Sequence, residues 1–238
     1  SVLGFLWSFL NPLLMMMVYT ILFTILIPNR NIRQYPIFIL VALIPWQFLA
    51  GSLMGCTTSI VDGGSLIKKI YFPRILLPIS IVLSHLVNFA LSFIIVVIFL
   101  YASGNNLTVH ALWVPVILIA QIAFLLGLGF LFSTLQTFYR DVVMILEVGI
   151  LAWFFLTPVF YPYEQLSEQA TVWGITFNPA VIMRWLNPMA SIIDGFRTVL
   201  WGTLDSGGPV SMNPIFLLRT LVTSFLVLLV GYLVFVRT

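Results

Sequence analysis

Few residues in this 238-residue chain could act as acids, bases or ligands. His85 lies beside Ser84 and near Asn88, so its simplest role is a hydrogen bond between helices, with proton transfer as the alternative. Glu147 lies within a long apolar segment, where ionisable groups are costly and usually functional. We expect Glu147 to pair with a basic group on a neighbouring helix or, alternatively, to contact a substrate. No acidic relay of the kind that couples transport to protons or sodium is present.

Signatures of catalysis and of metal binding are absent from the sequence. There is no phosphate-binding Gly-rich loop followed by Lys and Ser or Thr, and no set of Cys and His residues at metal-ligand spacing. Gly63–Leu66 does not have the form of a nucleophile elbow. Cys56 is the only cysteine, so no intrachain disulfide can form, and we expect it to be a small packing residue. We therefore expect a non-catalytic chain without cofactor or metal, whose energy source lies in another chain.

The composition indicates a helical membrane protein. Hydrophobic residues make up 61% of the chain and charged residues 7%, whereas a soluble domain carries roughly 25% charged residues. Lipid requires every backbone N–H and C=O to pair inside the protein, which leaves helices or a closed barrel. Barrel strands alternate polar and apolar residues, whereas this chain has long continuous apolar runs. The net charge of +3, without a basic block, gives no support for nucleic-acid binding.

Charged residues and turn residues divide the apolar runs into segments of membrane-spanning length. About 20 apolar residues cross a bilayer, and residues 75–139 contain no Lys, Arg, Asp or Glu, which is long enough for two spans. We predict an all-α polytopic membrane protein, a single transmembrane domain over residues 1–238, with both termini on the same side. The six predicted spans are residues 3–27, 37–60, 75–101, 111–138, 142–161 and 215–236. Basic residues divide equally between the two sides, so the positive-inside rule does not orient the chain.

Residues 163–213 are too polar for a span and too apolar for a free loop. Asn-Pro pairs predict helix starts here, because Asn is a good N-cap and Pro suits the first helical position; they lie at 178–179, 187–188 and 213–214. After Pro188 the apolar residues follow helical spacing, and Asp194 and Arg197 are placed for an i,i+3 pair. We predict two short helices that re-enter the membrane from one face and narrow its exit, with this pair near water. The residues assigned to the exit are Asn187, Pro188, Asp194 and Arg197.

Residues 62–74 form the most charged short segment. Asp62 or Ser65 can cap a helix there, and Pro73 ends it. The apolar stripe of this helix, which has Lys68 and Lys69 beside it, consists of Leu66, Ile67, Ile70 and Tyr71. The pattern fits an interfacial helix whose lysines touch lipid headgroups, and it also fits a helix that docks on a cytoplasmic partner.

Five short motifs occur in order along the chain. They are SVLGFLWSFLNPLL (1–14), SLIKKIYFPR (65–74), FYRD (138–141), LTPVFYP (156–162) and NPMASIIDGFR (187–197). Together with the six predicted spans, these motifs resemble the permease subunits of type-2 ABC exporters over essentially the whole chain. The resemblance is closest to permeases that export lipid-linked polysaccharides such as O-antigen, capsule or wall teichoic acid.

This resemblance implies a homodimer in a bacterial or archaeal cytoplasmic membrane, surrounded by membrane lipids, with both termini cytoplasmic. It also implies two separate nucleotide-binding subunits, which would hold ATP and Mg and hydrolyse the ATP. Residues 62–74 would be the coupling loop, which contacts these subunits through Asp62 and Ser65–Tyr71. An amphipathic helix usually precedes the first span in this family, and we expect it to be missing from the N-terminal end of this chain.

Aromatic residues make up 15% of the chain, and we expect most of them to face lipid or the membrane interface. Some are candidates to line a conduit, because aromatic faces stack on sugar rings without holding them by strong hydrogen bonds. These candidates lie in the first, second and fifth spans, which resemble the pore-lining spans of the family. They are Tyr19, Phe23, Trp46, Phe154, Phe155 and Tyr161.

We predict the permease of an ATP-driven exporter that moves a lipid-linked polysaccharide across the cytoplasmic membrane. The nearest alternative is an exporter of the same fold that handles a smaller lipid or a drug. The alternative from another class is an intramembrane enzyme, such as a transferase acting on lipid-linked sugars. That class usually needs carboxylates or His at a membrane face, for which only Asp141, Glu147 and His85 are candidates.

Overall fold

The computed structural model describes residues 10–11, 13–18, 21–22, 25, 32–64, 73–105, 107–166, 170–172 and 175–237. Most of the predicted first span, residues 3–27, lies outside the described residues, and so do the conduit candidates Tyr19 and Phe23. The predicted coupling residues Ser65–Tyr71 lie outside them as well. What the sequence predicts for these residues stays a prediction.

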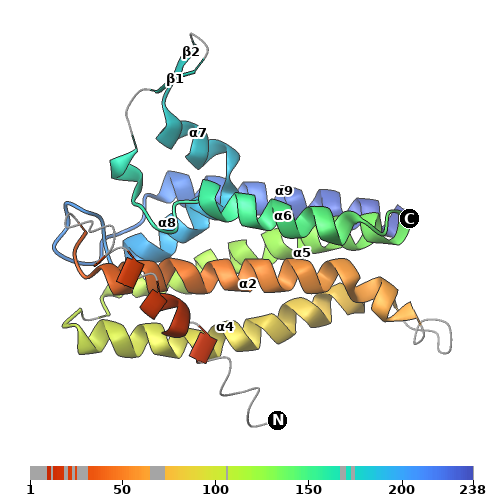
Figure 1. The fold of residues 1–238 in the computed structure, drawn as a ribbon, viewed down its shortest axis with the longest axis horizontal. Helices are drawn as coiled ribbons and strands as arrows, with labels where there is room; N and C mark the ends of the chain where they lie inside the picture. Colours follow the sequence, from red (N-terminus) through yellow and green to blue (C-terminus); the bar gives the residue numbers. More distant parts are fainter. Residues whose placement is uncertain are drawn as a thin grey trace.

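Most of the described chain consists of long helices that lie side by side along the long axis of the molecule (Figure 1). Four segments are long and apolar enough to cross a membrane. They are α2 (Tyr35–Asp62), α4 (Leu76–Ala102), α5 (Val114–Phe138) together with the short helix η2 (Val109–Trp113) before it, and α9 (Pro214–Arg237). A shorter apolar helix, α6 (Val142–Leu156), lies between α5 and α9 in the sequence. The four long segments overlap the second, third, fourth and sixth predicted spans, whereas α6 covers only the first 15 residues of the fifth. Uninterrupted apolar runs in a chain of this composition fold as helices.

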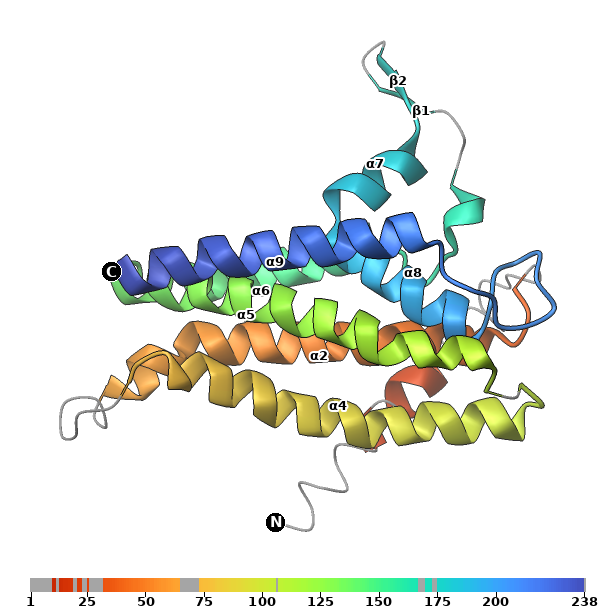
Figure 2. The ribbon, with the colours of Figure 1, turned by 180° about the vertical axis from the view of Figure 1, so that it is seen from behind.

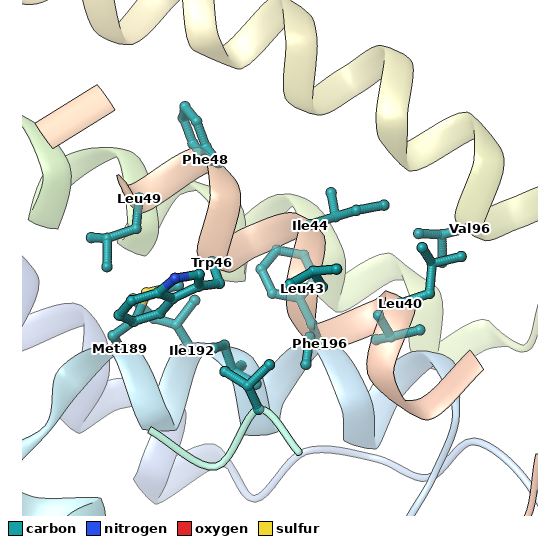
Figure 3. Packing of buried hydrophobic residues seen from close by; sticks show 14 of the residues in the cluster. Leu40, Leu43, Ile44, Trp46, Phe48, Leu49, Val96, Met189, Ile192 and Phe196 are labelled. Carbon is teal, nitrogen blue, oxygen red and sulfur yellow. The ribbon is translucent and has the colours of Figure 1, made fainter. Parts of the chain in front are cut away.

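Helix α2 lies at the centre of the bundle. In an 18-residue apolar stretch of α2, 78% of the residues are buried, compared with 28% in α4 and 22% in α9. A helix that is apolar on all sides is stable where neighbouring elements surround it. Figure 3 shows Leu43 and Trp46 of α2 close to Ile192 and Phe196, which belong to α8 (Pro188–Leu200). The apolar core is therefore centred on α2 and closed on one side by α8.

Helices α5 and α9 approach so closely that their backbones touch. A Cβ atom added at Gly127 of α5 would lie 2.5 Å from the backbone carbonyl carbon of Val227. A Cβ atom added at Gly231 of α9 would collide with the backbone carbonyl oxygen of Gly127. Small residues at such crossings allow membrane helices to pack tightly by van der Waals contact. These two glycines therefore fix the distance between α5 and α9.

Helix α6 ends at Leu156, before the predicted end of the fifth span at Tyr161. Thr157 has an extended backbone (φ −101°, ψ 137°) and precedes Pro158, whose ring disfavours a helical conformation of the residue before it. The backbone carbonyls from Pro158 to Tyr161 consequently leave the helical hydrogen-bond pattern and need other donors.

The segment between α6 and α9 contains more than the two predicted short helices. A single turn, η3 (Tyr163–Gln165), and an antiparallel hairpin of β1 (Ala170–Val172) and β2 (Ile175–Phe177) come first. Helix α7 (Pro179–Leu186) and the hairpin then project sideways from the bundle, whereas α8 lies inside it against α2, α5 and α9 (Figures 1 and 2). No residue of α7 is buried, but most of α8 is. The two helices thus occupy different environments, which their similar Asn-Pro starts did not indicate.

Candidate functional site

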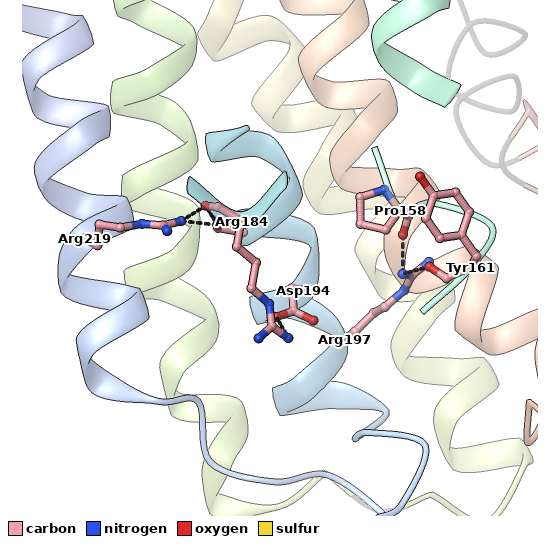
Figure 4. A network of polar contacts seen from close by, with 7 residues as sticks. Pro158, Tyr161, Arg184, Asp194, Arg197 and Arg219 are labelled. Atoms are coloured by element: carbon pink, nitrogen blue, oxygen red, sulfur yellow. Dashed lines mark hydrogen bonds and ion pairs between the residues drawn. The ribbon is translucent and has the colours of Figure 1, made fainter. Parts of the chain in front are cut away.

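Arg197 of α8 binds the carbonyls that the end of α6 leaves free. Its guanidinium group donates hydrogen bonds to four backbone carbonyls. Figure 4 shows those of Pro158 and, at 3.4 Å, Tyr161. The other two are those of Val159 and, at 3.4 Å, Phe38. Arg197 is only 4% exposed. The prediction that it lies near water and pairs with Asp194 is therefore wrong. Helical spacing places Arg197 opposite the apolar stripe of α8, but the break after α6 covers that side of the helix.

Asp194 instead pairs with Arg184 on α7. The Arg184 Nη2 and Asp194 Oδ2 atoms are 3.8 Å apart, and each side chain is 33% exposed. Packing removes part of the water around the Asp194 carboxylate and so raises its pKa to about 6, and the positive charge of Arg184 opposes this rise. Burial lowers the pKa of Arg197 to about 9, so its guanidinium group stays charged at neutral pH. The ion pair that was predicted within α8 is replaced by one that joins α7 to α8.

Asn187 connects the end of α6 to the start of α8. Its Oδ1 atom accepts hydrogen bonds from the Ala190 backbone N–H at 3.2 Å and from Trp153 Nε1 at 3.0 Å. Its Nδ2 atom donates to Thr157 Oγ1 at 3.0 Å. Pro188 follows as the first residue of α8, as the Asn-Pro pattern predicts. Asn187 therefore caps one helix while it holds the last turn of another.

Arg184 and Arg219 also belong to this network, although the sequence pattern did not assign them to the site. Arg219 of α9 donates to the backbone carbonyl of Arg184 and, at 2.6 Å, to Ser191 Oγ (Figure 4). Its guanidinium carbon lies 4.8 Å from the ring centroid of Trp185. These contacts tie α7, α8 and α9 together. The sequence feature that could have indicated this network is the presence of several arginines, with Asp194 as an acid, in the segment and helix that follow α6.

The conduit candidates within the described residues surround the end of α6. Trp46 of α2 and Phe154 of α6 have ring centroids 5.2 Å apart, and both are buried. Phe155, by contrast, is 62% exposed. The Tyr161 hydroxyl donates to the Phe155 backbone carbonyl at 3.3 Å. The structure thus brings together the predicted aromatic residues of the second and fifth spans.

A groove of about 420 Å³ runs between α2 and α6. It is lined by Trp46, Glu147, Val148, Ile150, Leu151 and Phe154. Glu147 is exposed, and no basic side chain of the described residues forms an ion pair with it. The ion pair that the sequence favoured for Glu147 is therefore not found in the described part of the chain. The carboxylate lies at the open surface of the groove.

Of the predicted coupling residues, only Asp62 belongs to the described chain, and it lies at the end of the bundle opposite Arg197. Asp62 is the last residue of α2 and is exposed. Helix α4 starts at this same end, which also carries the turn between α5 and α6 and the C-terminus (Figure 1). Asp62 therefore lies at the same end as these features, and the other predicted coupling residues, Ser65–Tyr71, fall outside the described ranges.

Comparisons with known proteins extend over most of the chain. Residues 1–201 match the family model described as ABC-2 type transporter. The chain is 34% identical over 201 residues to an O-antigen export system permease protein RfbA of Myxococcus xanthus, covering 84% of this chain and 74% of that protein. It is 33% identical over 236 residues to a protein of the same name from Klebsiella pneumoniae, covering 99% of this chain and 84% of that protein. This chain, with its apolar helices of spanning length, belongs to the ABC-2 type transporter family.

Proposed function

We propose that this chain is the permease subunit of an ATP-driven exporter that carries a lipid-linked polysaccharide of the O-antigen type across the bacterial inner membrane. The similarity over 99% of the chain to a protein named as an O-antigen export permease carries the proposal. The helices of spanning length agree with it. ATP and Mg would be held by a separate nucleotide-binding subunit, two copies of which serve two permease chains.

The open face of α6 supports a homodimer. Of the fifteen residues of this helix, the buried ones are Leu146, Ile150 and Phe154. Apart from Glu147, the large side chains exposed on it are apolar, among them Met144, Val148 and Leu151. Lipid can cover an apolar face, but an acidic residue in a membrane span such as Glu147 almost always faces the interior of a bundle or a water-filled cavity. The two-fold dimer is the commonest assembly of identical chains. In the proposed dimer the two α6 helices face each other across a conduit that neither copy encloses alone.

The arginine contacts support an orientation. At the end where α2 begins, the side chains of Arg33, Arg197 and Arg219 all donate to backbone carbonyls. At the opposite end, no hydrogen bond or ion pair of the Arg74, Arg140 or Arg237 side chains occurs among the described residues. Cations that are free to meet water and headgroups favour the cytoplasmic side. In the proposed orientation, the end with Asp62 and the C-terminus therefore faces the cytoplasm.

Two further segments have places in this arrangement. Helix α8 has 13 residues, too few to cross a bilayer of about 30 Å at 1.5 Å per residue. It would re-enter from the outer side and narrow the exit, a role that its burial in the bundle supports. Helix α7, which projects from the bundle and has no buried residue, would lie beside it at the outer membrane face. Residues Ser65–Tyr71, outside the described ranges, would form the coupling helix on the nucleotide-binding subunit.

Deletion of the gene in its native host tests the proposal. Glycan at the cell surface and lipid-linked glycan inside the cell would both be measured. We expect surface glycan to disappear and its lipid-linked precursor to accumulate inside, and we expect the intact chain, expressed with its nucleotide-binding subunit, to restore export. Unchanged surface glycan together with loss of a smaller exported lipid or drug would favour the nearest alternative and overturn the proposed substrate.

A further inference from the structure

We propose that the groove between α2 and α6 is a sugar-contact site in which Glu147 accepts hydrogen bonds from the hydroxyl groups of an uncharged glycan unit. This inference rests on the proposed function and names the substrate chemistry that the conduit selects. Three observations carry it: the position of the Glu147 carboxylate, the shape of the groove and the kinds of side chain that line it.

The position of Glu147 requires water beside it. It lies six residues after Asp141 in the sequence, which is about 9 Å further along a helix axis at 1.5 Å per residue. A carboxylate facing lipid at such a depth is costly, so acidic residues in spans almost always face the interior of a bundle or a water-filled cavity. Glu147 is exposed in the single chain and has no ion-pair partner among the described residues. Its face of α6 is therefore suited to an aqueous path rather than to lipid.

The groove forms a continuous strip along α6. Glu147, Leu151 and Phe154 follow one another at spacings of four and three residues, which place them on one face of the helix. Trp46 of α2 lines the same groove from the other side, and its ring centroid lies 5.2 Å from that of Phe154. The strip therefore has a carboxylate nearest the proposed cytoplasmic end and aromatic rings nearest the proposed exit.

The rings form the floor of the groove rather than open stacking surfaces. Trp46 is 5% exposed and Phe154 is 8% exposed, so a passing glycan would meet only their edges. Such shallow apolar contacts hold a polymer weakly and let it slide. The directional contact would come from Glu147, because an ionised carboxylate accepts hydrogen bonds at both oxygens and donates none.

The charge of Glu147 gives the site a selectivity. Hydroxyl groups of a neutral sugar can donate to the carboxylate, and an amino sugar that carries a positive charge would also be attracted. A uronic acid or a phosphate on the glycan would be repelled, and two copies of the chain would double this effect. Unpaired or like charges that disfavour the wrong ligand are a general means of specificity. The groove is therefore matched to glycans that carry no negative charge at the point of contact.

The test compares Glu147→Gln with the unsubstituted chain in proteoliposomes that contain the permease and its nucleotide-binding subunit. The two probes are a lipid-linked homopolymer of an uncharged hexose and a lipid-linked polymer that also carries uronic acid. We expect Glu147→Gln to lower the transport rate of the neutral polymer at least threefold and to raise the ratio of acidic to neutral transport. We expect Glu147→Asp to retain more than half of the neutral rate, because it keeps the carboxylate.

Ile145→Gln is the matched control, because Ile145 lies on the same helix, is 71% exposed and does not line the groove. It should leave the ratio of the two rates unchanged. Copurification of each variant with the nucleotide-binding subunit, together with its ATPase rate without glycan, shows that the variant has folded. If Glu147→Gln transports both polymers as the unsubstituted chain does, the sugar-contact site is refuted. If the unsubstituted chain transports neither polymer, the proposed function itself fails.

Discussion

The guanidinium carbon of Arg197 lies 3.7 Å from the ring centroid of Phe38, so α8 is joined to α2 by a cation–π contact. A desolvated contact of this kind is worth about 2 kcal/mol. The same guanidinium group binds the Phe38 backbone carbonyl and the carbonyls beyond the end of α6. One side chain therefore holds α2, α8 and the break after α6 in a fixed arrangement.

Arg197→Lys is expected to destabilise the protein although it keeps the charge. A lysine ammonium group is a compact point charge and cannot reproduce the planar fork that reaches four carbonyls. Each buried carbonyl left without a donor costs about 1–3 kcal/mol. Thermal unfolding in lipid nanodiscs should show a Tm several degrees lower. Arg33→Lys, whose bonds lie nearer the surface, is the control and should change Tm less; equal effects of the two substitutions would contradict the clamping role of Arg197.

Gly127→Ala should force α5 and α9 apart. The added Cβ atom would meet the α9 backbone at 2.5 Å, and backbone cannot rotate out of the way as a side chain can. Overpacking of this kind costs about 1–3 kcal/mol. Gly149→Ala on α6 is the matched control, because no other atom of the described chain lies within 4 Å of its added Cβ atom. At position 149 the better helix propensity of Ala should stabilise the folded protein by up to about 1 kcal/mol. Opposite changes in Tm are expected.

Asn187→Ala should lower stability more than Asn178→Ala. Both residues cap a helix, a contribution of about 1 kcal/mol. Asn187 also bonds to Trp153 and Thr157, whereas the Asn178 cap is exposed. Chemical unfolding of the two purified variants gives the comparison. Equal losses would mean that Asn187 acts only as a cap and does not connect α6 to α8.

Asp194→Asn is expected to flatten the dependence of stability on pH. Burial raises the pKa of Asp194 from 3.8 to about 6, so the folded protein binds this proton more tightly than the unfolded chain does. The stabilisation that results is complete below the ordinary pKa and is lost as the pH rises through the folded value. As the pH rises between these two pKa values, the Tm of the unsubstituted protein should therefore fall more than the Tm of the Asp194→Asn variant. Parallel Tm curves for the two proteins would contradict the raised pKa.

Cysteines introduced at Ser65 or Ile67 should cross-link to the nucleotide-binding subunit in the assembled transporter. The reason is the proposed docking of Ser65–Tyr71 on that subunit. Cys56, the native cysteine, is fully buried, so it can remain in place. Mass spectrometry of the cross-linked complex identifies the partner. Free reaction of both introduced cysteines with a membrane-impermeant reagent added outside intact cells would reverse the proposed orientation.

The helix starts are the part of the fold that local sequence predicts best. All three Asn-Pro pairs begin a helix, because capping depends on residues within one turn. The apolar positions predicted along α8 are likewise buried. The prediction for Arg197 was wrong because its partners, the carbonyls after Leu156, come from a different part of the chain. Spacing within one helix cannot show which distant backbone will cover its polar side. The hairpin of β1 and β2 was not predicted, because its strands are only three residues each.

The kinds of residue in the candidate site could be predicted from the sequence, but their arrangement in space could not. Aromatic residues of the second and fifth spans were predicted as candidates to line a conduit. Trp46 and Phe154 lie in contact with each other, and the conduit-lining role stays a prediction. For Glu147 the sequence left both a pairing role and a substrate role open. Only the packing of α6, which leaves that carboxylate at the surface of a groove and without an ion-pair partner in the described chain, favours the second role.

The contact between Gly127 and Gly231 also determines which parts of the subunit can move during a transport cycle. Helices whose backbones touch cannot slide past each other without first separating, so we expect α5 and α9 to travel as one rigid body. Within the described chain, Gly149 of α6 makes no such backbone contact. The chain bends after α6 at Pro158, and Arg197 holds this bend in place. Opening of the conduit would then be a tilt of α6 about this bend, against a stationary α5–α9 pair.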